Sequence, residues 1–207
     1  TVEAIARGLQ RVLVVMATGT GKTFTAFQII HKLHKSKAKK KILYLADRNV
    51  LIDQTMVQDF KPFKKQGIIT KIISPKEGEA KINSAFEVYM ALYHQLVGKE
   101  GKPDPFLEVQ PNFFDLIIVD EVSMLGLELA SFLLSAIKNQ AVLILVGDKD
   151  QLPSVDYGNI LADFIGCGLI ETYYLTEVMR QHGTILDNSQ LINHGSSALK
   201  QDKTFQV

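Results

Sequence analysis

The chain has 207 residues, of which 46% are hydrophobic and 22% charged, and its formal net charge is +1. These values describe an ordinary globular protein, long enough for one sizeable α/β domain or a cramped pair. The sequence has neither a long apolar run nor a secretory signal, so we expect no membrane span and a cytoplasmic location. Its single cysteine, Cys167, excludes an internal disulfide and is expected to be a small buried apolar residue.

The first pattern with chemical content is the segment VLVVMATGTGKTFTAFQII, residues 12–30. The apolar run at its start is typical of a buried parallel strand, and a glycine-rich turn follows. Beyond the turn the apolar residues have helical spacing, and we expect one packed side to include Phe24, Ala26, Phe27, Ile29, Ile30 and Leu33. A strand, a glycine turn and a helix form the geometry in which backbone N–H groups bind polyphosphate.

Each residue type in this turn has an expected role. Gly19 and Gly21 allow backbone angles and a close approach that a side chain would block. Lys22 places its charge between the terminal phosphates, and the Thr23 hydroxyl can hold Mg²⁺. The expected nucleotide-binding loop comprises Thr18, Gly19, Thr20, Gly21, Lys22 and Thr23. A chance glycine turn is the alternative, but the flanking strand and helix argue against it.

Positive charge is concentrated in the first part of the chain. Residues 1–76 contain 15 Lys or Arg against four acids, a net +11, so the remainder carries −10. Much of the excess lies in HKLHKSKAKKK, residues 31–41. Such a run is usually a solvated helix end and loop, and contact with a nucleic-acid backbone is the alternative.

Further strands are expected at spacings that leave room for helices: 41–47, 67–74, 113–121, 141–148 and 170–178. Helices are expected at 159–167 and at 125–137, where a broad apolar stripe includes Leu127, Leu129, Phe132, Leu133 and Ile137. The stretch 75–112 resembles surface loops around a short element near AFEVYMALYHQLV. Continuous apolar strands followed by helices predict one α/β domain over 1–207, with a mostly parallel sheet covered on both faces.

Two adjacent acids follow the expected strand in LIIVDEVS. Asp120 is placed to bind Mg²⁺, directly or through water, and Glu121 to polarise the water that attacks the γ-phosphate. Adjacent carboxylates at a strand end are costly without a cation or donors nearby. An exposed acidic turn is the alternative reading, which the Lys22 turn makes less favourable.

Two more polar residues follow strands in the second half of the chain. Gln151, in VLILVGDKDQLPSV, could hydrogen-bond the γ-phosphate or the attacking water, although a loop glutamine satisfied by its surroundings is the simpler alternative. Arg180, in LTEVMRQ, could reach the transferring phosphoryl group, whereas alone it would be read as a surface ion pair.

With these motifs the chain resembles the first RecA-like motor domain of a helicase or translocase. Residues 1 to about 110 resemble the motor subunit (HsdR) of type I restriction enzymes, through TVEAIARGLQRVLVVMATGTGKTFTAFQII, ILYLADRNVLIDQTMVQDFKPF and EGEAKINSAFEVYMALYHQL. Residues from about 114 to 207 resemble RecD-type superfamily 1 helicases, through IVDEVSM, ILVGDKDQLPSVDYGNILADFI, LTEVMRQ and ILDNSQLINHG. The resemblance implies a three-layer α/β P-loop NTPase fold.

The change of resemblance along the chain has two explanations. Asp120 and Glu121 are followed by Val122 and Ser123, as in RecD, whereas an HsdR-like chain would have a D-E-C-H type of motif there. A chimeric sequence joined near 111–116 would explain this difference. A natural divergent member of the family is the competing explanation.

The resemblance also implies roles for individual residues and for partners. ATP and Mg²⁺ would be bound by Asp120 and by the expected nucleotide-binding loop, residues 18–23, which we call the phosphate loop. Lys22, Glu121, Gln151 and Arg180 would act on the transferring phosphoryl group. DNA contacts are expected in the segment of Asp47, Arg48 and Asn49, and base stacking by Tyr157 is conceivable, although a structural role for that ring is favoured. The strand before Gln151 should lie between the strands before Lys22 and Asp120.

A second RecA-like domain or subunit, absent from this sequence, is expected to complete the ATP site. We therefore expect weak turnover by this chain alone. The competing hypotheses are an ATP-dependent DNA motor domain, a non-catalytic or engineered chimeric nucleotide-binding module, and another P-loop enzyme such as a small-molecule kinase. The last lacks an acceptor-site signature.

Overall fold

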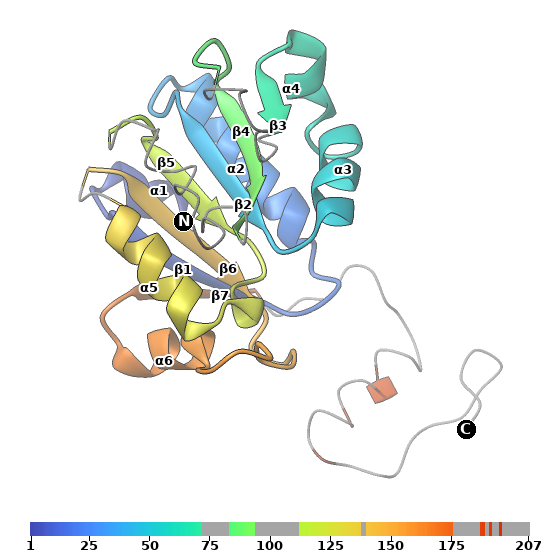
Figure 1. Cartoon of the computed structure of the whole chain (residues 1–207), viewed down its shortest axis with the longest axis vertical. Coiled ribbons are helices and arrows are strands. Elements are labelled where there is room, and N and C mark those ends of the chain that lie inside the picture. Colours follow the sequence, from blue (N-terminus) through green and yellow to red (C-terminus); the bar gives the residue numbers. More distant parts are fainter. Residues whose placement is uncertain are drawn as a thin grey trace, which may run out of the picture.

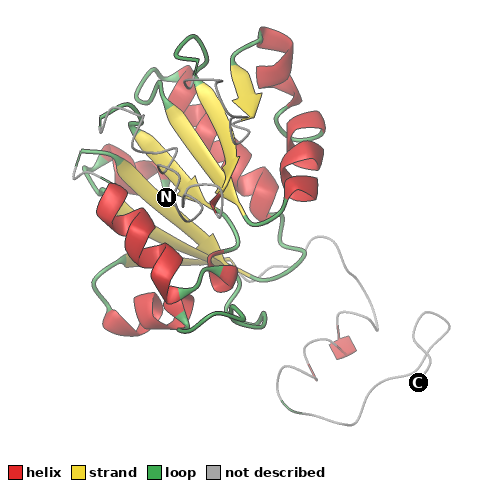
Figure 2. Cartoon of the chain, in the orientation of Figure 1, coloured by secondary structure: helices red, strands yellow, loops and turns green. Residues whose placement is uncertain are grey.

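The computed structural model describes residues 1–71, 83–93, 112–137 and 140–175, together with 187, 188, 191 and 195. Its centre is a seven-stranded sheet in the order β3-β4-β2-β5-β6-β1-β7, and every neighbouring pair is parallel (Figures 1 and 2). The strands are β1 (Arg11–Met16), β2 (Ile42–Ala46), β3 (Ile69–Lys71), β4 (Val88–Leu92), β5 (Leu116–Val119), β6 (Val142–Gly147) and β7 (Glu171–Leu175).

Helices cover both faces of this sheet. One face packs against α1 (Val2–Ala6), α2 (Lys22–Lys35), α3 (Asn49–Val57) and α4 (Lys61–Gln66). The other packs against α5 (Leu127–Ala136), α6 (Ile160–Cys167) and the short 3₁₀ helix η3 (Val122–Met124). Alternate residues of each strand enter the two apolar clusters, because successive strand side chains point to opposite faces. The predicted three-layer α/β architecture is confirmed.

The apolar strand patterns have the expected physical cause. All five residues of β2, all six of β6 and all four of β5 are buried, since each of these strands has a neighbour on both sides and helices on both faces. The strand β6, which precedes Gln151, lies between β1 and β5, so the predicted order at the centre of the sheet is confirmed.

The short element expected near AFEVYMALYHQLV is a strand. It is β4, which pairs with β2 along its whole length and is completely buried. The loop-like composition around it conceals this, because the neighbouring charged and glycine-rich residues dominate the segment; residues 72–82 and 94–111 lie outside the described part of the chain. Of the strand expected at 67–74, the structure describes β3, and of that expected at 170–178, β7.

Some side chains predicted to be buried are exposed. Phe24, in the first turn of α2, is 55% exposed, while Phe27 and Ile30 are buried. Leu127 and Phe132 of α5 are 55% and 49% exposed, because that helix turns a narrower stripe toward the sheet than expected, centred on Ala130 and Leu133.

Cys167 is exposed too, which corrects the expectation of a buried residue. It is the last residue of α6, just before the left-handed Gly168, so its side chain leaves the packed part of the helix. In the described part of the chain, none of the helices has the length and apolar composition that a membrane span needs.

Candidate functional site

The candidate site lies at the edge where the strands end. In a parallel sheet all carboxyl ends meet at one edge, which we call the carboxyl edge. The loop after β1 carries Lys22, the residues after β5 are Asp120 and Glu121, and the residues after β6 include Asp148 and Gln151. Since β1, β6 and β5 are adjacent, residues up to about 130 positions apart in the sequence meet here.

The phosphate loop already has the backbone conformation that its glycines predict. Gly19 and Gly21 have φ values of 85° and 83°, in the left-handed region that glycine tolerates best. Gly21 is the N-cap of the 14-residue helix α2, and its carbonyl accepts from the Thr25 amide at 2.9 Å. The Thr20 hydroxyl donates to the Ala17 carbonyl at 2.7 Å, a hydrogen bond within the turn that stabilises it. The N-terminus of α2 is thereby fixed at the carboxyl edge.

Lys22 bridges two acids from different strands. Its Nζ lies 3.2 Å from Glu121 Oε2 and 3.9 Å from Asp148 Oδ2, and its side chain is only 10% exposed. A lysine ammonium held within 4 Å of two carboxylates at low exposure is directed at the same space as the acids. The predicted convergence of Lys22 and Glu121 is therefore present in the structure.

The backbone at Glu121 is unusual. Glu121 has φ 55° and ψ 46°, a left-handed conformation that costs a non-glycine residue on the order of 1–2 kcal/mol. The reversal ends β5 and begins η3, where the Met124 amide donates to the Glu121 carbonyl at 2.9 Å. It is also the conformation in which the Glu121 carboxylate meets Lys22. A strained residue at this position fits a functional constraint.

Asp120 is a buried carboxylate. It is 4% exposed, with Oδ1 accepting from the Glu121 amide at 2.9 Å and Oδ2 from the Tyr44 hydroxyl. Burial raises its pKa to about 6, and the neighbouring Glu121 charge adds to the rise, while the Tyr44 hydrogen bond and Lys22 oppose it. A carboxylate in such surroundings is stabilised by a cation. This is the setting in which a divalent ion would be bound.

Asp148 is a site residue that the sequence motifs did not predict. It is 2% exposed, and its Oδ2 accepts from the Thr18 hydroxyl at 2.7 Å. Gln151 Nε2 donates to Thr18 Oγ1 at 3.1 Å and approaches Asp148 Oδ2 at 3.4 Å, so these three side chains link the phosphate loop to the loop after β6. The available signal was the position of Asp148, directly after a buried strand, which is also the position of Asp120.

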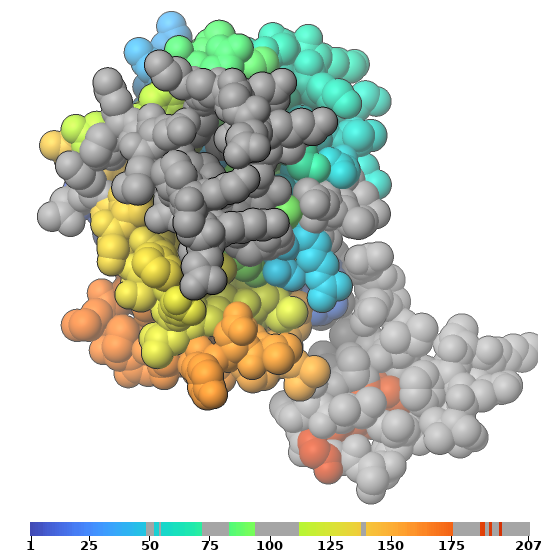
Figure 3. Space-filling view, in the orientation of Figure 1, coloured from blue at the N-terminus to red at the C-terminus, as the bar shows by residue number. Residues whose placement is uncertain are grey.

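The residues considered for DNA contact lie around the same edge. Arg48 follows β2, forms an ion pair with Asp47 at 3.1 Å, and has a side chain that is 71% exposed. Asn49 begins α3. Tyr157 is 92% exposed, and its backbone carbonyl accepts from the Leu127 amide at 2.8 Å. The backbone of Tyr157 thus makes a structural contact while its side chain is open to solvent. Figure 3 shows the orange surface of the later segments lying against the yellow surface of the segment that includes α5. Arg180 lies outside the described residues.

The basic run is remote from this site. Because α2 begins at the carboxyl edge and β2 starts at Ile42, residues 36–41 lie at the opposite, amino edge of the sheet. Lys37 and Lys40 are exposed there, as are Lys64 and Lys65 near the end of α4. The basic run is thus the end of α2 and an exposed loop, as the sequence predicted.

The described residues contain no cluster of three or more His, Cys, Asp or Glu side chains suited to holding a metal ion alone. Mg²⁺ is commonly bound by one or two protein oxygens together with substrate phosphates and water. Asp120, which accepts from the Tyr44 hydroxyl, and the hydroxyl of Thr23 in the first turn of α2 could offer oxygen ligands of that kind. The residues therefore fit a magnesium ion that arrives with a nucleotide.

Known proteins resemble the chain over parts of its length. The type I restriction enzyme EcoAI endonuclease subunit of Escherichia coli is 52% identical over 121 residues, which cover 58% of this chain and 14% of that protein. The ATP-dependent RecD2 DNA helicase of Deinococcus radiodurans is 38% identical over 116 residues, covering 55% of this chain and 16% of the helicase. The chain thus spans less than a fifth of the length of either relative.

Solved structures share the fold at low sequence identity. The Pif1 helicase of Candida albicans has a TM-score of 0.58 and 18% identity, over 93% of this chain and 42% of that one. The Hef helicase domain of Pyrococcus furiosus has a TM-score of 0.57 and 20% identity, over 85% of this chain and 38% of that one. These likenesses support the RecA-like α/β P-loop architecture.

The family described as "Type III restriction enzyme, res subunit" (ResIII) matches residues 1–150. This range includes the phosphate loop, the acids after β5 and Asp148. It also includes 111–116, the region of the suspected join, and the chimeric origin stays a hypothesis. Since the match covers well over half of the sequence, the chain belongs to the ResIII family.

Proposed function

We propose that this chain is the ATP-binding and ATP-hydrolysing motor domain of a DNA helicase or translocase. The carrying observation is the meeting of Lys22 with Glu121 and Asp148, at 3.2 and 3.9 Å, from three adjacent strands. A phosphate loop facing strand-end acids is the arrangement that phosphoryl transfer uses. Membership of the ResIII family and the likeness to a protein named as an ATP-dependent DNA helicase support the proposal.

In this proposal the chain's own groups divide the chemistry among them. The amides of the phosphate loop and the Lys22 ammonium bind the phosphates, and Thr23 and Asp120 hold Mg²⁺. The ion would neutralise charge on the β- and γ-phosphate oxygens when bound. Nucleotide phosphates would compete with Glu121 for Lys22, which would free that carboxylate to accept a proton from the attacking water.

The loop after β6 would sense the γ-phosphate. Gln151 is tied to the phosphate loop through Thr18 and Asp148, so a change at the terminal phosphate would alter the same hydrogen bonds that hold this loop. Arg180 is proposed to neutralise charge on the transferring group. This assignment comes from the sequence alone.

Two partners are part of the proposal. DNA would contact the carboxyl-edge loops, where the Arg48 guanidinium and the Tyr157 ring are exposed, and Asn49 is included from the sequence. A second RecA-like domain or subunit would complete the ATP site. The relatives named above are much longer than this chain, which leaves room for such a domain in them.

The test is ATP hydrolysis by the whole chain, with and without Mg²⁺ and single-stranded DNA. Lys22→Ala and Glu121→Gln should each reduce phosphate release by at least roughly 100-fold, because each removes a group acting on the transferring phosphoryl group. Glu121→Gln should still bind the nucleotide. The matched control is Lys37→Ala, which removes an exposed lysine at the amino edge and should leave turnover unchanged.

A nucleotide-binding module without turnover is the second candidate. It is favoured by the direct pairing of Lys22 with Glu121, which keeps the proposed base engaged in this structure. Lys22-dependent binding of ATP without phosphate release, even with DNA present, would support this reading and reject the motor. Phosphate release that persists in Lys22→Ala would reject both.

A further inference from the structure

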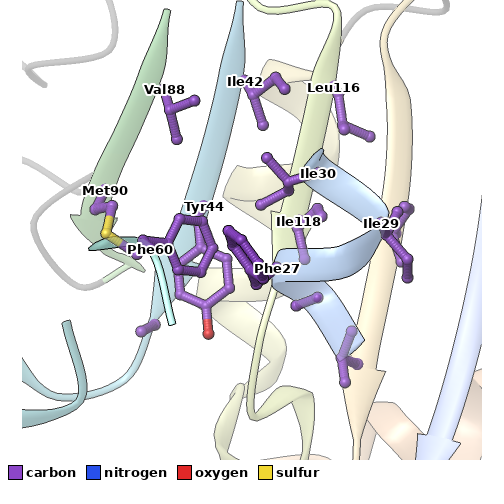
Figure 4. Packing of buried hydrophobic residues seen from close by; sticks show 14 of the residues in the cluster. Phe27, Ile29, Ile30, Ile42, Tyr44, Phe60, Val88, Met90, Leu116 and Ile118 are labelled. Atoms are coloured by element: carbon purple, nitrogen blue, oxygen red, sulfur yellow. The ribbon is translucent and has the colours of Figure 1, made fainter. Parts of the chain in front are cut away.

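Tyr44 places a polar group inside an otherwise apolar part of the core. It lies in the middle of β2, is 2% exposed and packs against Phe60, with the two rings tilted by 56° and their centroids 5.6 Å apart. Figure 4 shows its ring among Phe27, Phe60 and Met90, with the hydroxyl oxygen directed along the strands toward their ends. A phenylalanine would satisfy the packing, so the hydroxyl calls for a separate explanation.

The hydroxyl holds one of the two proposed magnesium ligands and lies near the other. It donates to Asp120 Oδ2, and the Thr23 side chain is close enough to oppose the rise in the Tyr44 pKa that burial causes. Asp120 Oδ1 is fixed independently by the Glu121 amide at 2.9 Å. Both oxygens of the buried carboxylate are thus held, and its orientation relative to Thr23 depends on Tyr44.

The surroundings of Tyr44 favour the protonated form of its hydroxyl. Burial, followed by the nearby Asp120 charge, raises its pKa well above the ordinary tyrosine value. Loss of its proton would place a second negative charge beside Asp120 in a buried site. The Tyr44 hydroxyl therefore acts as the hydrogen-bond donor to the Asp120 carboxylate.

Two other buried tyrosines show that this arrangement is specific. The Tyr89 hydroxyl, on the neighbouring strand β4, lies 2.8 Å from the backbone carbonyl oxygens of both Asn83 and Phe86, and its one proton is donated to these acceptors. The Tyr93 hydroxyl is buried with no partner in ordinary hydrogen-bond geometry among the described residues, although Asp47 is close enough to add to the effect of burial in raising its pKa. Tyr44 alone of the three donates to Asp120 in the described part of the chain.

We propose that Tyr44 is a positioning residue for the divalent-cation site, holding Asp120 and Thr23 in the relative orientation that a magnesium–nucleotide complex requires. This inference rests on the proposed function, because it takes Asp120 and Thr23 as the groups that hold the ion. Partners that orient metal ligands commonly change metal affinity by roughly 10- to 100-fold when removed. The hydroxyl should therefore govern the affinity for the ion more strongly than the affinity for the nucleotide.

The experiment compares Tyr44→Phe with Tyr89→Phe in the whole chain. Each substitution removes one hydroxyl from a buried ring on adjacent strands, so the two variants are matched in size and burial. Binding of a fluorescent ATP analogue is measured while Mg²⁺ is titrated, and again in EDTA. Tyr44→Phe should raise the half-saturating Mg²⁺ concentration roughly 10- to 100-fold and change nucleotide binding in EDTA by less than about twofold. Tyr89→Phe should behave like the unaltered chain in both titrations.

A Tyr44→Phe titration that overlays that of the unaltered chain would overturn the proposal. So would equal shifts in both variants, because they would indicate a general effect on the sheet. If Tyr44→Phe does not fold, the tyrosine absorption of the unaltered chain is recorded as Mg²⁺ is added in the presence of ADP. A perturbation retained in Tyr89→Phe supports the proposal, and its absence rejects it.

Lys22→Ala separates failure of this proposal from failure of the proposed function. Where the unaltered chain binds the magnesium–nucleotide complex and Lys22→Ala does not, the nucleotide site stands. An unchanged Tyr44→Phe then rejects the positioning role alone. Loss of any Lys22-dependent binding would reject the proposed function itself.

Discussion

At the carboxyl edge of the sheet, Asp120 and Asp148 are buried beside Lys22, whereas at the amino edge Lys37, Lys40, Lys64 and Lys65 extend into solvent. The first edge keeps charges where water is scarce, which is costly unless each charge has a partner or a ligand. The second keeps charge outside and packs aromatic rings beneath it. We infer that the charges buried at the carboxyl edge lower the stability of the fold, and that the amino edge, with its charges in solvent, does not have this cost.

The largest expected effect is on stability and comes from the amino edge. Phe63 of α4 is 1% exposed and packs against Phe27 and Phe60, with ring centroids 5.7 and 5.9 Å apart. Phe63→Ala should lower the free energy of unfolding by about 3–5 kcal/mol, the usual cost of removing a buried ring. Denaturant unfolding followed by circular dichroism measures this.

Nucleotide affinity, measured on the folded fraction of that variant, should be unchanged. If Phe63→Ala proves too unstable, Phe63→Leu gives a smaller loss in the same direction. Weaker nucleotide binding by folded Phe63→Leu would show that the two edges are coupled, and would break the comparison.

The next effect is a pH dependence at the carboxyl edge. The Asp120 pKa is raised to about 6 in the folded chain, so between about pH 4 and 6 the folded chain retains a proton that the unfolded chain has released. Stability from this group is consequently present at low pH and lost as the pH rises through that window. The free energy of unfolding of Asp120→Asn, relative to that of the unaltered chain, should therefore rise by up to about 3 kcal/mol as the pH is raised from 4 to 7.

Urea unfolding of both proteins at several pH values, without nucleotide, checks this difference. Subtracting the two curves removes the contribution of Asp59, whose pKa is also raised by burial. A difference that stays flat with pH, or that falls, would mean that Asp120 is not destabilised by its surroundings.

A smaller effect is expected at the loop after β6. Asp148→Asn keeps the shape of the side chain but removes the charge near Lys22 and the strong acceptor for Thr18. We expect ATP turnover to fall roughly 10- to 100-fold, as for other residues that orient a reacting group. Steady-state kinetics measure it, and the matched control is Asp150→Asn, two positions away, whose partner is the exposed Lys149 at 2.7 Å.

The smallest effect is expected for the basic run. Lys37→Glu combined with Lys40→Glu should change the free energy of unfolding by less than about 0.5 kcal/mol per site, because both side chains are exposed. ATP turnover without DNA should be unchanged. A loss of turnover comparable to that of Asp148→Asn would place a functional site at the amino edge and contradict the comparison.

The fold was predictable from the sequence because its signals are local. The strands β1, β2, β5 and β6 are continuous apolar runs, and each is followed by a turn or a helix start. The strand β4 was harder to recognise, since its burial comes from pairing with β2 and β3 rather than from its own flanking residues. The width of the buried face of α5 was overestimated, because a stripe of apolar residues in the sequence does not show how wide the surface is that packs against it.

The candidate site was predictable where a motif marks it. Lys22 and Glu121 stand in recognisable patterns, and the structure brings them together. Tyr44 and Asp148 were missed because their importance arises from neighbours that are distant in sequence: Tyr44 meets a residue 76 positions away, and Asp148 one 130 positions away. Such contacts depend on the strand order, which a linear motif does not contain.

The position of β1 has a consequence for synthesis of the chain on the ribosome. Its two neighbours in the sheet are β6 and β7, which are made more than a hundred residues later. Until then the apolar strand β1 has neither of its two sheet partners, and the nascent polypeptide must keep it from associating with other chains. The loop that follows β1 therefore acquires its final surroundings only after β6 has been made.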